Sequence, residues 1–144
     1  MKITLTELYC GLCRTVVTLQ MGEDRRVSDF LAKLIASNPN AAKSLQTSIA
    51  TITSTHAYRN KRKFKNVGDE IFEIKVPGIR LYCFKDKIDS LESKLIIATN
   101  GGTTNNKREQ NSDIKQAAQI RDRYFAAKNR SDTTLHYHAI DHEN

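Results

Sequence analysis

A run of positive charge between residues 58 and 65 is the feature of this sequence best suited to chemistry. Residues 58–65 read Tyr-Arg-Asn-Lys-Arg-Lys-Phe-Lys, which is five cations in eight residues without an acid. The cations are Arg59, Lys61, Arg62, Lys63 and Lys65. Cations with interleaved aromatic rings suit a nucleic acid, because the charges meet phosphates and the rings stack on bases. A solvated loop is the alternative interpretation.

Two more cations flank a tight turn. Lys75 and Arg80 lie on either side of Val76-Pro77-Gly78, between the segments 71–76 and 79–84. Apolar and polar residues alternate in both segments, which predicts two strands, and the Pro-Gly pair predicts a turn. In the resulting hairpin the two side chains could converge on one phosphate. The alternative for Arg80 is a charge on the sheet surface.

The cysteines and the C-terminal histidines form a less specific pattern. Cys10 and Cys13 have C-x-x-C spacing, and His136, His138 and His142 could in principle complete a zinc site. A single C-x-x-C with distant histidines favours ordinary apolar or strand-edge cysteines instead. We therefore expect neither a metal nor a cofactor. Three cysteines in a chain without secretory features fit a reducing cytoplasm.

Length and charge bound the fold and the partner. A chain of 144 residues with 39% hydrophobic and 27% charged residues fits one globular domain. No apolar run approaches the ~20 residues of a membrane span, and no signal peptide follows Met1. The net charge of +7 points to a polyanionic partner. Residues 129–144 carry one arginine against three acids, so residues 1–128 hold +9.

The elements that must position these residues follow from hydrophobic periodicity. Strands are predicted at 14–21, 71–76, 79–84 and 94–99, and the last of these is the most central. Helices are predicted over 27–35, from 42 to about 58 and from about 112 to 128. The expected fold class is α+β, a small and mostly antiparallel sheet with an N-terminal helical hairpin and a C-terminal helix. Residues 1–128 form the domain, and 129–144 form a polar tail that is poorly ordered unless something docks it.

The hairpin and the segment after it resemble a known family. Residues 71–82 resemble the central hairpin of the RelE/ParE toxin superfamily, where a strand ending in lysine turns into a strand that opens with an apolar residue and an arginine. The strand at 95–98, the basic pair Lys107-Arg108 and the helix to Tyr124 resemble the HigB-like, phage-derived branch. The resemblance covers residues 71–125, and the preceding strand and helices match in element order only.

The resemblance implies a RelE/ParE-like fold and the toxin of a type II toxin–antitoxin system. It implies a ribosome-dependent endoribonuclease that cuts messenger RNA in the cytoplasm, with an antitoxin partner that carries a helix-turn-helix domain. The implied catalytic residues, which stabilise charge on the scissile phosphate, are Arg80, Lys75 and Arg108. The implied RNA-binding residues are Arg59, Lys61, Arg62, Lys63, Lys65 and Lys107. No membrane partner is implied.

Departures from the family pattern leave the general acid and base unassigned. Glu73 stands where RelE-like members carry a lysine, and it is either a base or the charge partner of a neighbouring cation. The candidate tyrosines near the C-terminus are Tyr124, which its spacing places on a buried face, and Tyr137 in the tail. These departures keep two alternatives open. One is a ParE-like toxin that binds and inhibits DNA gyrase without nuclease activity, and the other is an inactive nucleic-acid-binding relative.

Overall fold

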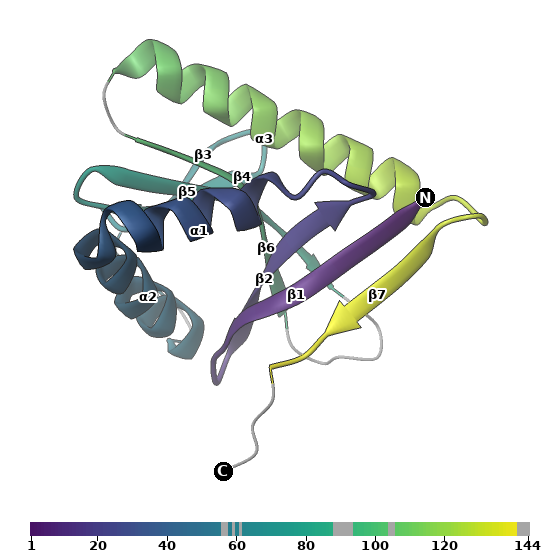
Figure 1. Cartoon of the computed structure of the whole chain (residues 1–144), viewed down its shortest axis with the longest axis horizontal. Helices are drawn as coiled ribbons and strands as arrows, with labels where there is room; N and C mark the ends of the chain where they lie inside the picture. The colour runs from purple at the N-terminus through teal and green to yellow at the C-terminus, as the bar shows by residue number, and fades with distance from the viewer. Residues whose placement is uncertain (56–57, 59, 61, 88–93, 104–105, 141–144) are drawn as a thin grey trace.

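The computed structural model, drawn in Figure 1, describes residues 1–55, 58, 60, 62–87, 94–103 and 106–140. Seven strands and three helices lie within these ranges. In chain order they are β1 (Lys2–Cys10), β2 (Arg14–Met21), α1 (Arg26–Ser37), α2 (Pro39–Ser54), β3 (Phe64–Gly68), β4 (Ile71–Val76), β5 (Ile79–Lys87), β6 (Lys94–Thr103), α3 (Lys107–Lys128) and β7 (Thr134–His138).

All seven strands form one mixed sheet in the order β3-β4-β5-β6-β2-β1-β7. Neighbouring strands are antiparallel except for β2 beside β6 and β1 beside β7, which are parallel. The strand at 94–99 is confirmed as the central one, since β6 is the fourth of the seven. Its residues 95–100 are all buried, as expected of a strand covered on both faces.

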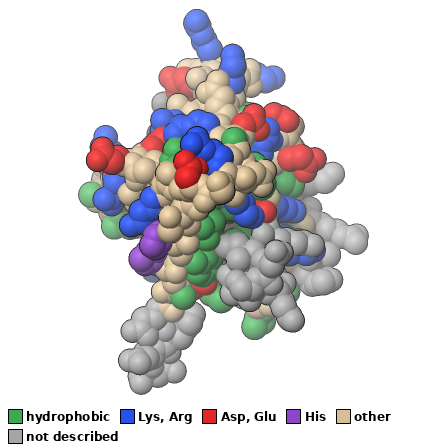
Figure 2. Space-filling model, turned by 90° about the vertical axis from the view of Figure 1, so that its right-hand side faces the viewer, with side chains coloured by type: hydrophobic (Ala, Val, Ile, Leu, Met, Phe, Trp, Pro, Cys, Tyr) green, Lys and Arg blue, Asp and Glu red, His purple; other side chains and the backbone are tan. Residues whose placement is uncertain are grey.

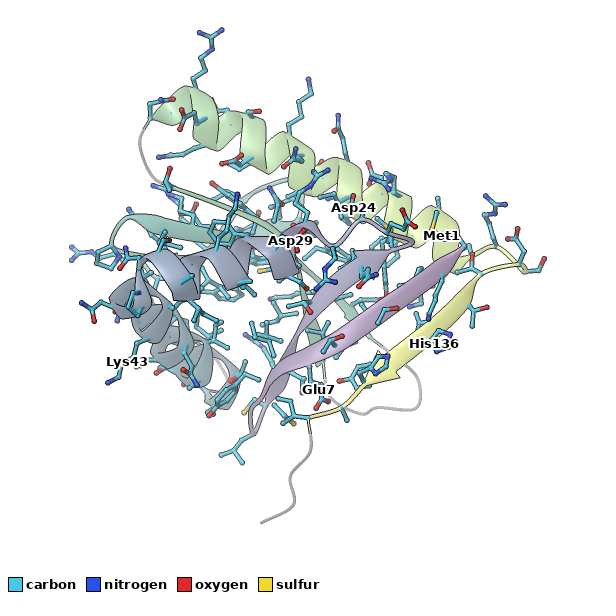
Figure 3. All side chains as sticks on the ribbon, viewed as in Figure 1. Met1, Glu7, Asp24, Asp29, Lys43 and His136 are labelled. Atoms are coloured by element: carbon cyan, nitrogen blue, oxygen red, sulfur yellow. The ribbon has the colours of Figure 1, made fainter. Side chains whose placement is uncertain are left out.

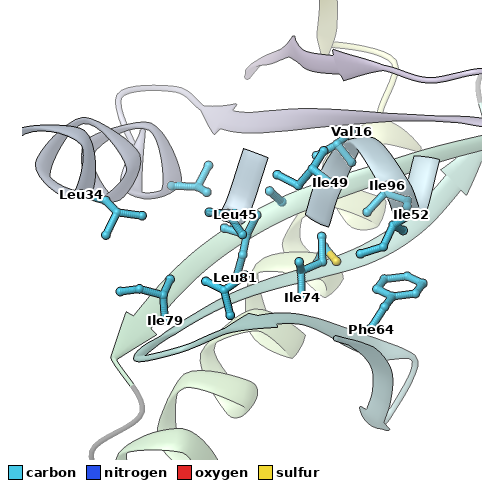
Figure 4. Packing of buried hydrophobic residues seen from close by; sticks show 14 of the residues in the cluster. Val16, Leu34, Leu45, Ile49, Ile52, Phe64, Ile74, Ile79, Leu81 and Ile96 are labelled. Atoms are coloured by element: carbon cyan, nitrogen blue, oxygen red, sulfur yellow. The ribbon is translucent and has the colours of Figure 1, made fainter. Parts of the chain in front are cut away.

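Helices cover both faces of the sheet (Figure 1). The helices α1 and α2 pack on one face, over a core that includes Val16, Ile52, Ile74 and Ile96. Figure 4 shows how side chains of α2 meet those of β4, β5 and β6 in this core. On the opposite face α3 covers a second apolar cluster, built from residues of β1, β2, β4, β5, β6 and α3.

Local sequence explains where the helices begin. The side chain of Asn38 accepts a hydrogen bond from the Ala41 N–H at 3.2 Å, and Pro39 occupies the first helical position of α2. At α3 the Asn106 side chain accepts from the Glu109 N–H at 2.8 Å. Because this cap lies six residues before Ser112, α3 includes the basic pair that the sequence analysis placed in a loop.

The expected fold class is wrong. The sheet has seven strands and is larger than expected. Two strands precede α1 and α2, so these helices do not form an N-terminal hairpin. The strands β1, β3 and β7 were not predicted. In β3 only Phe64 is buried, so the strand lacks a periodic apolar signal.

The segment after Lys128 is partly ordered against the sheet. Residues 134–138 of the expected tail form β7, which pairs in parallel with β1 from Lys2 to Thr6. Tyr137 fixes this edge by donating a hydrogen bond to Glu7 Oε2 at 2.6 Å. The docking partner that the tail required is thus β1 of the same chain.

No helix in the described part of the chain is long and apolar enough to cross a membrane.

Candidate nucleic-acid interface

Four polar residues form a row across β3, β4, β5 and β6. Strand pairing places Lys65 opposite Glu73, Glu73 opposite Tyr82, and Tyr82 opposite Asn100. Residues directly opposite each other in neighbouring strands project from the same face of a sheet. The Asn100 side chain contacts α3, so this is the face that α3 covers. We call the row of Lys65, Glu73, Tyr82 and Asn100 the polar strip.

The next row holds the two cations of the β4–β5 hairpin. Lys75 lies directly opposite Arg80, which in turn lies opposite Gly102 on β6. The register places these two residues side by side, and the convergence of their side chains on one phosphate stays a prediction. Arg80 nevertheless forms an ion pair with Glu73, in which its Nη1 lies 2.7 Å from Glu73 Oε2. The side chains are only 13% and 2% exposed, so the ion pair is nearly buried, whereas Lys75 is exposed.

Two polar atoms of this region are buried without a hydrogen-bond partner among the described residues. They are the hydroxyl of Tyr82 and Nε of Arg80. Burial, followed by the nearby carboxylates of Glu73 and Asp113, raises the pKa of Tyr82 to about 12. Tyr82 therefore keeps its proton at neutral pH. Buried polar groups usually find partners, so two exceptions side by side mark a site rather than ordinary core.

The N-terminal half of α3 closes one end of the strip. Asn100 donates from Nδ2 to the Asp113 carbonyl at 3.1 Å and to Gln116 Oε1 at 3.4 Å. A Cβ on Gly102 would lie 2.3 Å from Asp113 Oδ2, so the Asp113 carboxylate lies close against the backbone of β6. Desolvation, and then the charge of Glu109, raises the pKa of Asp113.

The other end of the strip opens into a cavity at the β3–β4 edge of the sheet. The cavity has a volume of about 500 Å³ and is lined by Arg62, Lys63, Lys65, Glu73, Lys75, Val76 and Pro77. Four of these seven residues are cations, and Arg62, Lys63, Lys65 and Lys75 are all exposed. We call this cavity the cationic groove. Among the described lining residues Glu73 is the one acid, and it is paired with Arg80.

The structure brings together some of the predicted site residues and separates others. Lys107 and Arg108 lie in the first turn of α3 and are exposed. No hydrogen bond or ion pair within the described ranges joins either of them to Lys75 or Arg80. Arg59 and Lys61 lie outside the described residues.

The aromatic rings of the cationic run are structural. Phe64 is 7% exposed, and its ring stacks on that of Phe72 with centroids 5.4 Å apart. Tyr58 meets the edge of the same Phe64 ring at 6.4 Å. The predicted stacking of bases between the cations is therefore wrong for Phe64, because the ring belongs to the core between β3 and α2.

The late tyrosines and histidines do not approach the groove. Tyr124 is confirmed as buried and donates to Asp86 Oδ2 at 2.7 Å. Tyr137, His136 and His138 lie on β7, the edge strand opposite to β3. In Figure 2, which views the β7 side, acidic and basic side chains are mixed rather than segregated. A tyrosine or histidine from this edge is thus no acid or base for chemistry at the cationic groove.

The C-x-x-C pair lies at the turn between β1 and β2. Cys13 Sγ lies 3.7 Å from the Ser54 carbonyl, and Cys10 Sγ accepts from Thr15 Oγ1 at 3.6 Å. Within the described ranges no three His, Cys, Asp or Glu side chains gather as metal ligands.

Sequence reasoning missed Tyr82, Asn100 and Asp113. A signal for Tyr82 was present, because it lies two residues after Arg80 and strand alternation puts both on one face. Asn100 ends an apolar strand immediately before two glycines, a pattern that indicates close backbone approach. No protein-family model matches this chain, and comparisons with curated proteins and with solved structures find no similar protein.

Proposed function

We propose that the chain binds RNA at the cationic groove and cleaves it, as a toxin that inhibits translation. The observation that carries this proposal is the grouping of four exposed cations around one carboxylate–guanidinium pair. A phosphate backbone matches the cations, because each neutralised phosphate releases a counterion. The carboxylate gives the same cavity a group that can accept a proton.

The reaction that suits this set of residues is attack of a ribose 2′-hydroxyl on the adjacent phosphate. The O2′–P bond forms as the P–O5′ bond breaks, which leaves a cyclic 2′,3′-phosphate and a free 5′-hydroxyl. We propose that Glu73 is the base that takes the 2′ proton. Arg80 and Lys75 stabilise the negative charge that develops on the phosphorane. The exposed ammonium of Lys75 supplies the proton for the leaving 5′ oxygen.

Glu73 needs access to the substrate, since its side chain is only 2% exposed in the free chain. A bound phosphate competes with the carboxylate for the Arg80 guanidinium, because both are anions of matching geometry. Movement of Arg80 toward the phosphate would uncover Glu73 as the substrate arrives. Substrate binding and activation of the base are coupled in this scheme.

The resemblance to the RelE/ParE superfamily, and to its HigB-like branch, sets the biological context of the proposal. We propose that the RNA is a message on the ribosome in the cytoplasm. A cognate antitoxin with a helix-turn-helix domain would neutralise the toxin, and acidic groups of this partner would complement the cationic groove.

Expression of the chain under an inducible promoter tests the proposal. Growth should stop, and mapping of message 5′ ends should show cuts within translated codons. Lys75→Ala and Glu73→Gln should restore growth and remove the cuts, whereas the control Lys115→Ala, an exposed lysine of α3, should behave as the parent. Growth arrest with uncut messages would refute cleavage.

The ParE-like alternative has one observation in its favour. Arg80 is paired with Glu73 and is 13% exposed, so the free chain presents no open guanidinium there. If this pair is only structural, induction should produce a DNA damage response while messages stay intact.

A further inference from the structure

A second cavity continues the cationic groove onto α2. It measures about 480 Å³ and shares Lys63, Lys75, Val76 and Pro77 with the groove. Its remaining lining residues come from the first three turns of α2 and are Asn40, Lys43, Ser44, Thr47 and Ser48. The two cavities are therefore parts of one depression.

The depression passes from one face of the sheet to the other. Lys65 and Glu73 belong to the polar strip on the α3 face, whereas α2 covers the opposite face. Three of the shared residues, Lys75, Val76 and Pro77, lie where β4 ends and the turn to β5 begins. Lys63 lies beside them, because its carbonyl accepts a hydrogen bond from the Lys75 N–H at 2.8 Å. A ligand that fills both cavities must bend around this edge.

Charge in the whole depression has one sign at its surface. The cations are Lys43, Arg62, Lys63, Lys65 and Lys75, and all five are exposed. Glu73 is the single acid in either lining, and it is ion-paired with Arg80. Lys43 projects outward from α2 (Figure 3). Ser44 adds an exposed hydroxyl group that can contact a phosphate oxygen, whereas the Thr47 hydroxyl donates to the Lys43 carbonyl at 3.0 Å.

We propose that this depression is a track for single-stranded RNA, in which Lys43 and Ser44 hold phosphates beyond the scissile one. This inference rests on the proposed RNA-binding function of the groove. A single strand can follow a bend over one β-turn, whereas a nucleic-acid duplex is stiff on this length scale. Lys43 is thus a binding residue that acts on long substrates and has no part in the chemistry.

Binding of 2′-O-methyl oligouridine, which lacks the attacking hydroxyl, tests the track. For a strand of about 12 nucleotides, Lys43→Ala should weaken binding at least threefold at about 100 mM salt and lower the slope of log K against log salt by about 0.7. A trinucleotide should bind the parent and this variant equally. Lys33→Ala is the matched control, since Lys33 is exposed on α1 and lines neither cavity.

Three outcomes would overturn the track. They are equal binding of the long strand by the Lys43→Ala and Lys33→Ala variants, an equal loss with the trinucleotide, and equal affinity for a duplex of the same length. Lys75→Ala separates this inference from the function on which it rests. If Lys75→Ala weakens binding of both strand lengths while Lys43→Ala weakens neither, the groove binds RNA and the track does not exist. If the parent binds neither strand, both proposals fall.

Discussion

The two faces of the sheet treat buried polar groups differently. Under α1 and α2, the buried polar residues include Ser48 and Thr53 of α2. Thr53 Oγ1 donates to the Ile49 carbonyl of its own helix at 2.8 Å. Under α3, buried Glu73 pairs with Arg80 of the neighbouring strand and buried Asn100 donates to α3. The buried hydroxyl of Tyr82 has no partner among the described residues.

This contrast separates buried polar groups that are structural from those that need another explanation. A hydroxyl that bonds one turn back along its own helix is satisfied wherever the helix packs, at little cost. The buried Glu73 carboxylate is neutralised by one guanidinium, that of Arg80 on the neighbouring strand. The buried Tyr82 hydroxyl has no hydrogen-bond partner among the described residues. Such groups lower stability unless something offsets them, so their grouping beside a cationic groove favours a functional explanation.

The largest expected effect is that of Arg80→Ala. The substitution leaves the Glu73 carboxylate buried without its partner, which should lower the free energy of unfolding by about 3–5 kcal/mol. Urea denaturation of the purified protein measures this loss.

A double variant separates the charge from the packing of the arginine. In Glu73→Gln/Arg80→Ala the buried charge is gone, so much of the lost stability should return. If the double variant is as unstable as Arg80→Ala alone, the stranded carboxylate is not the cause.

The apolar face should respond to a change in volume without an effect on binding. Ile52 is fully buried between α2 and the sheet, so Ile52→Ala should cost about 3 kcal/mol through lost burial and a cavity. The affinity of the folded variant for oligouridine should match that of the parent in a fluorescence titration. A large loss of affinity in folded protein would show that the two faces are not independent.

Tyr82→Phe should change stability in the opposite direction. The tyrosine hydroxyl is buried without a described partner, and its removal should stabilise the fold by about 1 kcal/mol. The measurement is urea denaturation at pH 7. Destabilisation by 1 kcal/mol or more would mean that the hydroxyl makes a bond that holds the fold together.

The parent and the Tyr82→Phe variant should also differ in how their stability depends on pH. An unfolded chain loses the tyrosine proton near pH 10.0, whereas the folded chain holds that of Tyr82 to about pH 12. Between these values the folded state binds more protons, so this residue makes stability fall as the pH rises. Tyr82→Phe should therefore lose less stability than the parent between pH 10 and pH 12. Identical pH dependence in the two proteins would contradict the raised pKa.

The smallest effect concerns the thiols. Cys83 is fully buried in the α1–α2 face, and burial raises the pKa of its thiol to about 12. Cys10 is exposed and Cys13 is half-buried. A thiol reagent should label these two in the folded protein and Cys83 only after unfolding. Rapid labelling of all three would show that this core opens more readily than its packing indicates.

Local pattern predicted the hairpin and most helical segments, and the reason lies in short-range chemistry. The turn Val76-Pro77-Gly78 sets the β4–β5 register by itself, and this register places Lys75 opposite Arg80. The same reasoning failed for β7, which pairs in parallel with β1 across more than 120 residues. Such parallel pairing leaves no turn signal in the sequence.

Electrostatic partners were also beyond the sequence. Alternation puts Glu73, Lys75 and Arg80 on one face, but either cation could have paired with the acid. Only packing under α3, which buries Glu73 and Arg80 and leaves Lys75 exposed, decided the pair.

By itself, then, the sequence determined the excess of positive charge, the hairpin that carries two of the cations and the caps that begin α2 and α3, because each depends on neighbours within a few residues. The tertiary structure decided which of these cations line one groove. Lys63, Lys75 and Lys43 come from β3, β4 and α2 or their flanks, and they share one depression only because the sheet edge and α2 pack together. Side-chain packing between distant segments sets that proximity, and no local pattern encodes it.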